Sequence, residues 1–102
     1  MVSRTKRGKA FQAFFDDIVE GVRHIPGVAG AVGNEWPGPE IVVFVDEIRE
    51  ELSEQISDAK SAVFQTHLDI DVEFHVRWLG GLRLEDYELA ECDLVYSRDD
   101  GN

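Results

Sequence analysis

Ile41–Val45 is the longest uninterrupted apolar run of the chain, and its residues are β-branched except for Phe44. Such a run predicts a central strand that is buried on both faces. Pro37 and Pro39 stiffen the turn before it, and a short strand of small residues over Val28–Gly33 precedes that turn. The run is far too short to cross a bilayer. A chain organised around it is expected to form a small sheet with helices packed on it.

Two segments carry apolar residues at intervals of three and four, which is the spacing of an amphipathic helix. The first runs over Ala10–Ile25 and ends at Pro26. The second begins at Asp46, a good N-cap residue, and continues to about Gln65. The expected apolar stripes are Phe11, Phe14, Phe15, Ile18, Val22 and Ile25 in the first helix and Ile48, Leu52, Ile56, Ala59 and Val63 in the second.

Leu68–Leu79 alternates between apolar and polar residues, which predicts a strand with one buried face. The expected buried face is Ile70, Val72, Phe74, Val76 and Trp78, and the expected solvated face is Asp69, Asp71, Glu73, His75 and Arg77. A last strand is expected over Cys92–Ser97. The order helix, strand, strand, helix, strand and a further strand indicates an α+β fold, a two-layer α/β sandwich with both helices on one face of a small mixed sheet.

The length of 102 residues allows one domain. We expect a basic flexible arm over residues 1–9, a single α/β domain over 10–97 and a disordered tail over 98–102. No apolar segment follows the first charges as in a signal peptide, and the single cysteine, Cys92, rules out an internal disulfide framework. Both observations favour a cytoplasmic location.

The chain is strongly acidic, with 21 acidic against 10 basic residues and a net charge of −11. Such a surface repels nucleic acid and anionic membranes, so neither is an expected partner. The exception is the arm with Arg4, Lys6, Arg7 and Lys9, which could contact RNA, fold back on the acidic body or be a frayed terminus. Many acids with few lysines also resemble the proteins of salt-loving organisms, where the charge serves solubility.

Several segments resemble the minimal nucleotidyltransferase family, whose members are small catalytic domains that are often partners of a helical subunit. Gly30-Ala31 stands where that family has a glycine-serine turn, and Gly33–Pro37 resembles the loop that follows. Pro39–Val45 resembles the strand that carries an Asp-x-Asp pair, and Leu68–Val76 resembles the strand with a third aspartate. Leu89–Tyr96 is similar to the final strand of such domains.

The resemblance implies a Mg²⁺ site built from three carboxylates that hold a triphosphate. The candidate catalytic residues are Glu40, Asp69 and Asp71, with Glu40 and Asp71 as candidate metal ligands. Valine at position 42 replaces the second carboxylate of the pair, and Ala31 replaces the turn serine. The candidate ligand or interface residues around the turn are Gly30, Gly33, Asn34 and Trp36.

These departures favour a nucleotidyltransferase-like domain without catalysis, which acts by self-association or by binding a protein partner through a sheet edge or the Trp36 turn. Such a domain needs no cofactor. The alternative is a divergent Mg²⁺-dependent nucleotidyltransferase. A weaker resemblance, over Ile25–Val45, is to a small α-β-β-α-β domain associated with trypsin-like proteases, and it implies a protein-interaction module of an enzyme complex.

Overall fold

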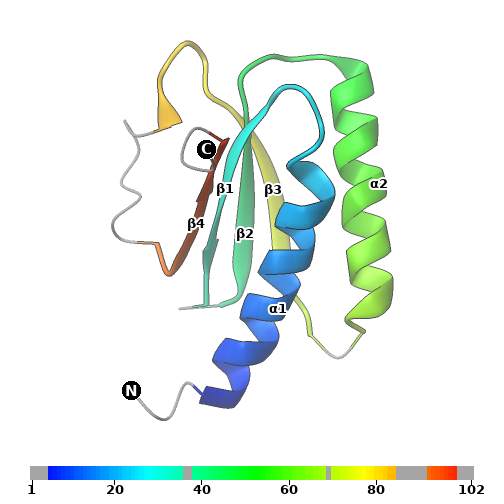
Figure 1. Cartoon of the computed structure of the whole chain (residues 1–102), viewed down its shortest axis with the longest axis vertical. Helices are drawn as coiled ribbons and strands as arrows, with labels where there is room; N and C mark the ends of the chain where they lie inside the picture. The colour runs from blue at the N-terminus through cyan, green and yellow to red at the C-terminus, as the bar shows by residue number, and fades with distance from the viewer. Residues whose placement is uncertain (1–4, 36–37, 69, 85–91, 99–102) are drawn as a thin grey trace.

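The computed structural model describes residues 5–35, 38–68, 70–84 and 92–98. Within them the chain forms two helices and four strands, in the expected order and as the expected α+β sandwich. The elements are α1 (Thr5–Val22), β1 (Val28–Asn34), β2 (Glu40–Val45), α2 (Glu50–Thr66), β3 (Glu73–Trp78) and β4 (Leu94–Ser97). Both helices lie on the same side of the sheet (Figure 1).

The sheet has the strand order β3-β2-β1-β4 and mixes two kinds of pairing. β1 is antiparallel to both of its neighbours, β2 and β4. β2 and β3 are parallel, because α2 carries the chain back from the end of β2 to the opposite end of the sheet. β3 and β4 are therefore the two edge strands.

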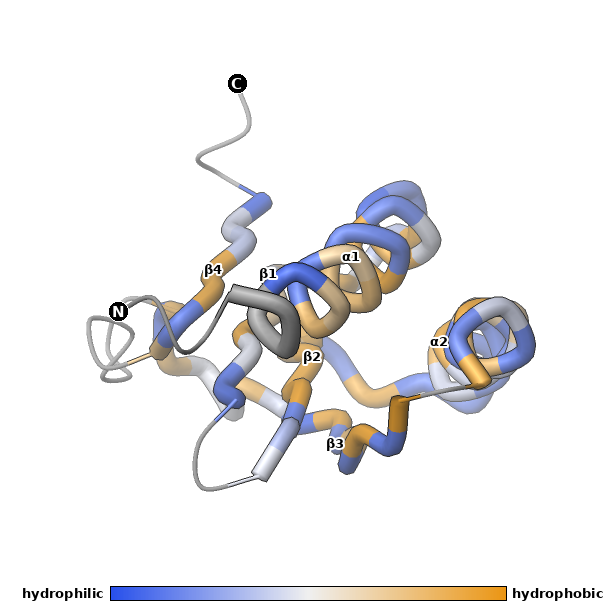
Figure 2. The backbone as a smooth tube through the Cα atoms, turned by 90° about the horizontal axis from the view of Figure 1, so that it is seen from below, coloured by the Kyte–Doolittle hydropathy of each residue, from blue (hydrophilic) through white to orange (hydrophobic). Residues whose placement is uncertain are grey.

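The predicted central strand, β2, contributes to a hydrophobic core on each side of the sheet. Ile41 and Val43 are fully buried on the helix side, in the main core with the stripes of α1 and α2. Phe44 points to the other side, where it packs with Val32 and Leu79 in a smaller core. Figure 2 shows the hydrophobic residues of the two helices turned toward the sheet. Burial of β2 on both faces is thus confirmed.

The helix boundaries differ from the predicted ones. α1 begins at Thr5, before the expected start at Ala10, so it includes part of the segment expected to be an arm. α2 begins at Glu50, and Arg49 occupies the N-cap position without a side-chain capping bond. The prediction that Asp46 caps this helix is therefore wrong. Asp46 instead holds Arg98, with Nη1 3.0 Å from Oδ2, across the end of the sheet.

The prediction for the third strand is wrong in its length and in its burial. β3 begins at Glu73 rather than at Leu68, and Trp78, expected in the core, is 52% exposed. Phe74 does pack against the main core, but Val76 is 47% exposed. The alternation correctly assigns Val76 and Trp78 to the helix side, but β3 is an edge strand and its second half is only partly covered. The last strand is also shorter than predicted, beginning at Leu94.

Four expectations, those for the arm, the tail, Trp36 and Asp69, fall partly or wholly outside the described residues. Arg4 and residues 99–102 are not described, so the arm is described only from Thr5 onward and the tail only at Arg98. Trp36 and Asp69 are also outside. No helix in the described part of the chain is both long enough and apolar enough to cross a membrane.

Candidate functional site

Gly30 and Gly33, predicted as ligand or interface residues, lie in β1 with other side chains packed against them. A Cβ atom on Gly30 would lie 2.5 Å from Cδ2 of Leu84. A Cβ atom on Gly33 would lie 2.9 Å from Cδ1 of Phe15 in α1. Both glycines therefore serve the close approach of another segment to the strand.

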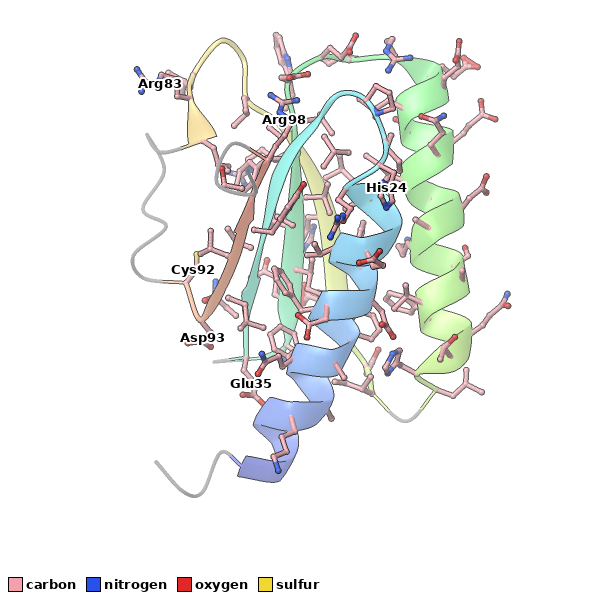
Figure 3. All side chains as sticks on the ribbon, in the orientation of Figure 1. His24, Glu35, Arg83, Cys92, Asp93 and Arg98 are labelled. Atoms are coloured by element: carbon pink, nitrogen blue, oxygen red, sulfur yellow. The ribbon has the colours of Figure 1, made fainter. Side chains whose placement is uncertain are left out.

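Asn34 ends β1 and links it to the segment that enters β4. Its Oδ1 accepts a hydrogen bond from the Asp93 N–H at 3.0 Å, and its Nδ2 donates to Cys92 Sγ at 3.7 Å. The Glu35 N–H returns a bond to Asp93 Oδ2 at 3.0 Å. Figure 3 shows Glu35, Cys92 and Asp93 at the same end of the sheet. The Asn34 amide is thus engaged by two neighbours in the protein itself.

Glu40, the first residue of β2, lies beside Glu73 and near His75 of β3. Glu40 and Glu73 are register partners. Nε2 of His75 lies 3.4 Å from Oε2 of Glu40 and 3.5 Å from Oε2 of Glu73. These three side chains are between 44% and 75% exposed, so the ion pairs that form on protonation of His75 stabilise the fold by at most ~1 kcal/mol.

The predicted metal pair, Glu40 and Asp71, is not a register pair in the sheet. Asp71 precedes the start of β3, and Glu73 occupies the position opposite Glu40. Val42, the other position that catalysis would require to be acidic, is the register partner of His75. Among the described residues, no group of three His, Cys, Asp or Glu side chains is arranged to hold a metal ion.

A groove lies between β3 and the start of α2. We call it the β3 groove. Its volume is about 240 Å³, and it is lined mainly by Ile48, Arg49, Leu52, Ile56, Val76 and Trp78. Ile48, on the loop before α2, is 72% exposed although it was predicted to belong to the buried stripe of that helix. Three large apolar side chains, those of Ile48, Val76 and Trp78, are therefore in contact with solvent around one hollow.

Arg49 fixes the loop at the mouth of this groove. Its Nε donates to Glu47 Oε1 at 2.9 Å, and its Nη2 donates to the Pro26 carbonyl at 3.2 Å. The guanidinium thus ties the loop before α2 to the loop after α1. The position of Ile48, between Glu47 and Arg49, is correspondingly constrained.

Sequence reasoning missed both this groove and the Glu40–Glu73–His75 cluster. The period-two pattern placed Glu73 and His75 on one face, but the register between β2 and β3 decides that they meet Glu40. The same pattern assigned Val76 and Trp78 to the core. The pattern by itself does not report whether a strand lies at the edge of the sheet, which decides the exposure of Val76 and Trp78.

Comparisons with protein-family models, with curated proteins and with solved structures gave no match. The resemblance to minimal nucleotidyltransferases therefore stays a prediction from the sequence, and the geometry of the site carries the functional argument.

Proposed function

We propose that this chain is a non-catalytic protein-binding domain that contacts its partner through the β3 groove. The observation that carries the proposal is the grouping of Ile48, Val76 and Trp78, all more than 45% exposed, beside an edge strand. Exposed apolar side chains that adjoin one another at a hollow are typical of protein interaction sites. Scattered apolar residues would carry no such meaning.

The absence of catalysis is supported by the residues around Glu40. Val42 cannot ligate a metal, and Asp71 is not opposite Glu40 in the sheet. A Mg²⁺·ATP titration followed by NMR tests this part. Saturable binding that Glu40→Ala abolishes would contradict a non-catalytic domain and favour the divergent nucleotidyltransferase.

The binding surface is tested by placing a charge in the β3 groove. Val76→Glu and Trp78→Glu introduce a carboxylate there, whereas Leu82→Glu introduces one at another exposed apolar residue that does not line the groove. Circular dichroism checks that all three variants are folded. Affinity-tagged forms are expressed in cells of the native source, and the proteins that co-purify are quantified by mass spectrometry.

We expect a protein that the wild type and Leu82→Glu retain and that both groove variants lose at least tenfold. A dimer seen by sedimentation that Val76→Glu dissociates would equally support binding through this surface, with self-association as its form. Equal recovery of every co-purifying protein by all four forms, together with a monomer at all concentrations, would contradict the proposal.

A further inference from the structure

β3 is an edge strand, and no other strand lies beside its outer side among the described residues. The N–H groups of Glu73 and Leu79 donate to main-chain carbonyls on the β2 side, at 3.0 and 2.9 Å. Successive residues of a strand direct their main-chain groups to opposite sides. The N–H and C=O groups of Phe74, Val76 and Trp78 therefore point away from the sheet, where an added strand can pair with them.

Hollows lie at both ends of the seam between α2 and β3. The β3 groove is at the end of Trp78, and a second hollow of about 220 Å³ lies at the other end. Phe64, Leu68 and Ile70 contribute to this second hollow, and Leu68 is 86% exposed. The apolar surface thus follows the length of the strand, which suits an extended ligand better than a compact one.

The two faces of an added strand would meet different surroundings, because its side chains alternate between the faces. The even-numbered residues of β3, from Phe74 to Trp78, have their side chains on the helix side. The odd-numbered residues, from Glu73 to Arg77, have theirs on the side away from the helices, which we call the open face. Side chains of the added strand on the helix side enter the seam, and those on the open face lie directly opposite Glu73 and Arg77.

The open face of this edge is negative at one end and positive at the other. Glu40 and Glu73 approach His75 at 3.4 and 3.5 Å, and within the described residues neither forms an ion pair with Lys or Arg. Asp71, two residues before Glu73, is also exposed. Arg77 is exposed four residues after Glu73, about 13 Å along the strand. This separation exceeds the screening length of about 8 Å at physiological salt, so each end can select its own partner charge.

The charged residues on the helix side of the edge are engaged within the protein. Lys60 Nζ lies 5.4 Å from the centroid of the Phe74 ring and 6.0 Å from that of Phe64, which are cation–π distances. Glu47 lines the β3 groove, but its Oε1 accepts a hydrogen bond from Arg49 Nε at 2.9 Å. The helix side therefore favours apolar side chains, and the charge selection takes place on the open face.

A second copy of this chain would suit this edge in charge but not in shape. In an antiparallel pair of β3 strands, Arg77 of one copy could face Glu73 of the other. However, α2 covers the β3 end of the sheet (Figure 2), so such pairing would bring both α2 helices together on one face. Paired strands are about 4.8 Å apart, whereas packed helices need about 8–10 Å between their axes. A single strand without a helix fits beneath α2.

We propose that the β3 edge binds an extended segment of another protein as an antiparallel strand, with Lys or Arg opposite Glu73 and Asp or Glu opposite Arg77. This inference rests on the proposed function and names the chemistry of the partner. Apolar side chains at the alternate positions of the segment enter the seam beside Val76 and Trp78. Because the strands run antiparallel, the acidic residue of the segment comes four positions before the basic one. Antiparallel pairing is the more stable arrangement per residue.

The test uses two heptapeptides with blocked ends and NMR on the full chain at about pH 8, where a histidine side chain is ordinarily neutral. Both peptides have valine at the odd positions and threonine in the centre. The first has glutamate at its second position and lysine at its sixth, and the second has these two exchanged. Neither peptide has a net charge, so the overall charge of the protein does not distinguish them.

We expect the first peptide to bind about fivefold more tightly than the second, because both of its charges meet opposite charges in the antiparallel register. It should also slow the amide exchange of Phe74, Val76 and Trp78. The amides of β4, at the other edge, serve as the internal control. Equal affinities of the two peptides, or tighter binding of the second, would overturn the inference.

Exchanging the two charges of β3 provides the decisive variant. Glu73→Arg combined with Arg77→Glu keeps the net charge and is expected to bind the second peptide at least as tightly as the first. Glu20→Arg combined with Arg23→Glu exchanges an ion pair of α1 with a separation of 3.6 Å and should leave the preference within twofold. Circular dichroism checks that both variants are folded. A preference for the first peptide that survives the exchange in β3 would contradict recognition at these two positions.

The outcomes separate this inference from the proposed function. If neither peptide changes the edge amides while Val76→Glu and Trp78→Glu still lose the cellular partner, the added strand is wrong and the protein-binding function stands. If the edge amides are protected without peptide, and increasingly so at higher protein concentration, the occupant is a second copy and the inference is wrong. If no variant loses a partner and no peptide binds, both proposals fail.

Discussion

Gly30 shows how strongly a single position in this sheet depends on segments far away in the sequence. Its missing side chain leaves space for Leu84 on the side of the sheet away from the helices, and the carbonyl oxygen of Tyr96 is equally close to where a Cβ would lie. Leu84 can turn to another rotamer, but a main-chain carbonyl of a paired strand cannot move without disrupting the pairing of β1 with β4.

Gly30→Ala is therefore expected to destabilise the fold by about 2 kcal/mol, within the range for overpacked sites. Gly38→Ala is the matched control, because a Cβ there would have no atom within 4 Å, and it should change stability by less than ~0.5 kcal/mol. Urea unfolding followed by circular dichroism measures both. Equal stability of the two variants would show that β1 and the Leu84 segment yield more easily than the contacts indicate.

For single residues, the sequence identified positions with a specific environment but did not predict what each of them contacts. Gly30, Gly33 and Asn34 were singled out as ligand or interface residues, and each has a specific environment in the structure, filled by the protein's own side chains or main chain. A glycine in a strand indicates a close approach but does not identify what approaches. Leu84, Tyr96 and Asp93 lie too far along the chain for any local pattern to name them.

The helices and strands were predicted well in kind and order, because periodicity reports which face is apolar. The stripe of α1 from Phe11 to Val22 is buried as expected, and so are Leu52, Ile56 and Val63 of α2. The ends were less predictable. By residue type Asp46 is a favourable N-cap, but its carboxylate binds Arg98 instead. The spacing of apolar residues in α2 could not indicate this ion pair, because Arg98 lies far along the chain. Burial along β3 failed for a related reason, since exposure at an edge depends on what lies beside it.

Contact between the helices depends on small side chains. A Cβ on Gly21 of α1 would lie 3.2 Å from Cβ of Ala59 in α2, so the helices are close at this point. Farther along, Nε2 of His67, at the C-cap of α2, lies 2.6 Å from Oδ2 of Asp17. His67 also makes an edge-to-face contact with Phe14. Together these contacts determine how the helix layer covers the sheet.

Ala59→Leu is expected to destabilise the protein by about 1–3 kcal/mol, because the added atoms must separate the helices at Gly21. Ala62→Leu, on the exposed side of the same helix, should have an effect below ~0.5 kcal/mol. Thermal and urea unfolding of the two variants provide the comparison. If Ala59→Leu were as stable as the wild type, the close approach would have no structural importance.

For the whole molecule, the dominant property is negative charge on the surface. None of the buried side chains in the described residues is polar or charged, so the acids of this part are all at least partly accessible to solvent. A net charge of −11 in a chain of 102 residues favours expanded states through self-repulsion. The same charge makes separate copies of the chain repel one another. Such repulsion is consistent with a protein from a high-salt source and equally with a charge that only serves solubility.

Salt is therefore expected to stabilise the fold. Raising NaCl from 0.02 to 0.5 M should raise the midpoint of thermal unfolding by about 5 °C, because screening weakens repulsion between the acids. A variant with Glu54→Gln and Asp58→Asn, both on exposed positions of α2, should be more stable at low salt and respond less to added salt. A midpoint that is insensitive to salt in both proteins would show that self-repulsion is negligible.

The strand order has a consequence for how the chain is made in the cell. β1 emerges from the ribosome before the other three strands, whereas its outer neighbour, β4, is the last of the four to be synthesised. At roughly 5–20 residues per second, β1 waits several seconds with one side unpaired. Its sequence is mostly glycine and alanine with two valines, which makes it a poor template for pairing with other nascent chains. The small residues that admit Leu84 and Phe15 in the finished protein thereby lower the risk of aggregation during translation.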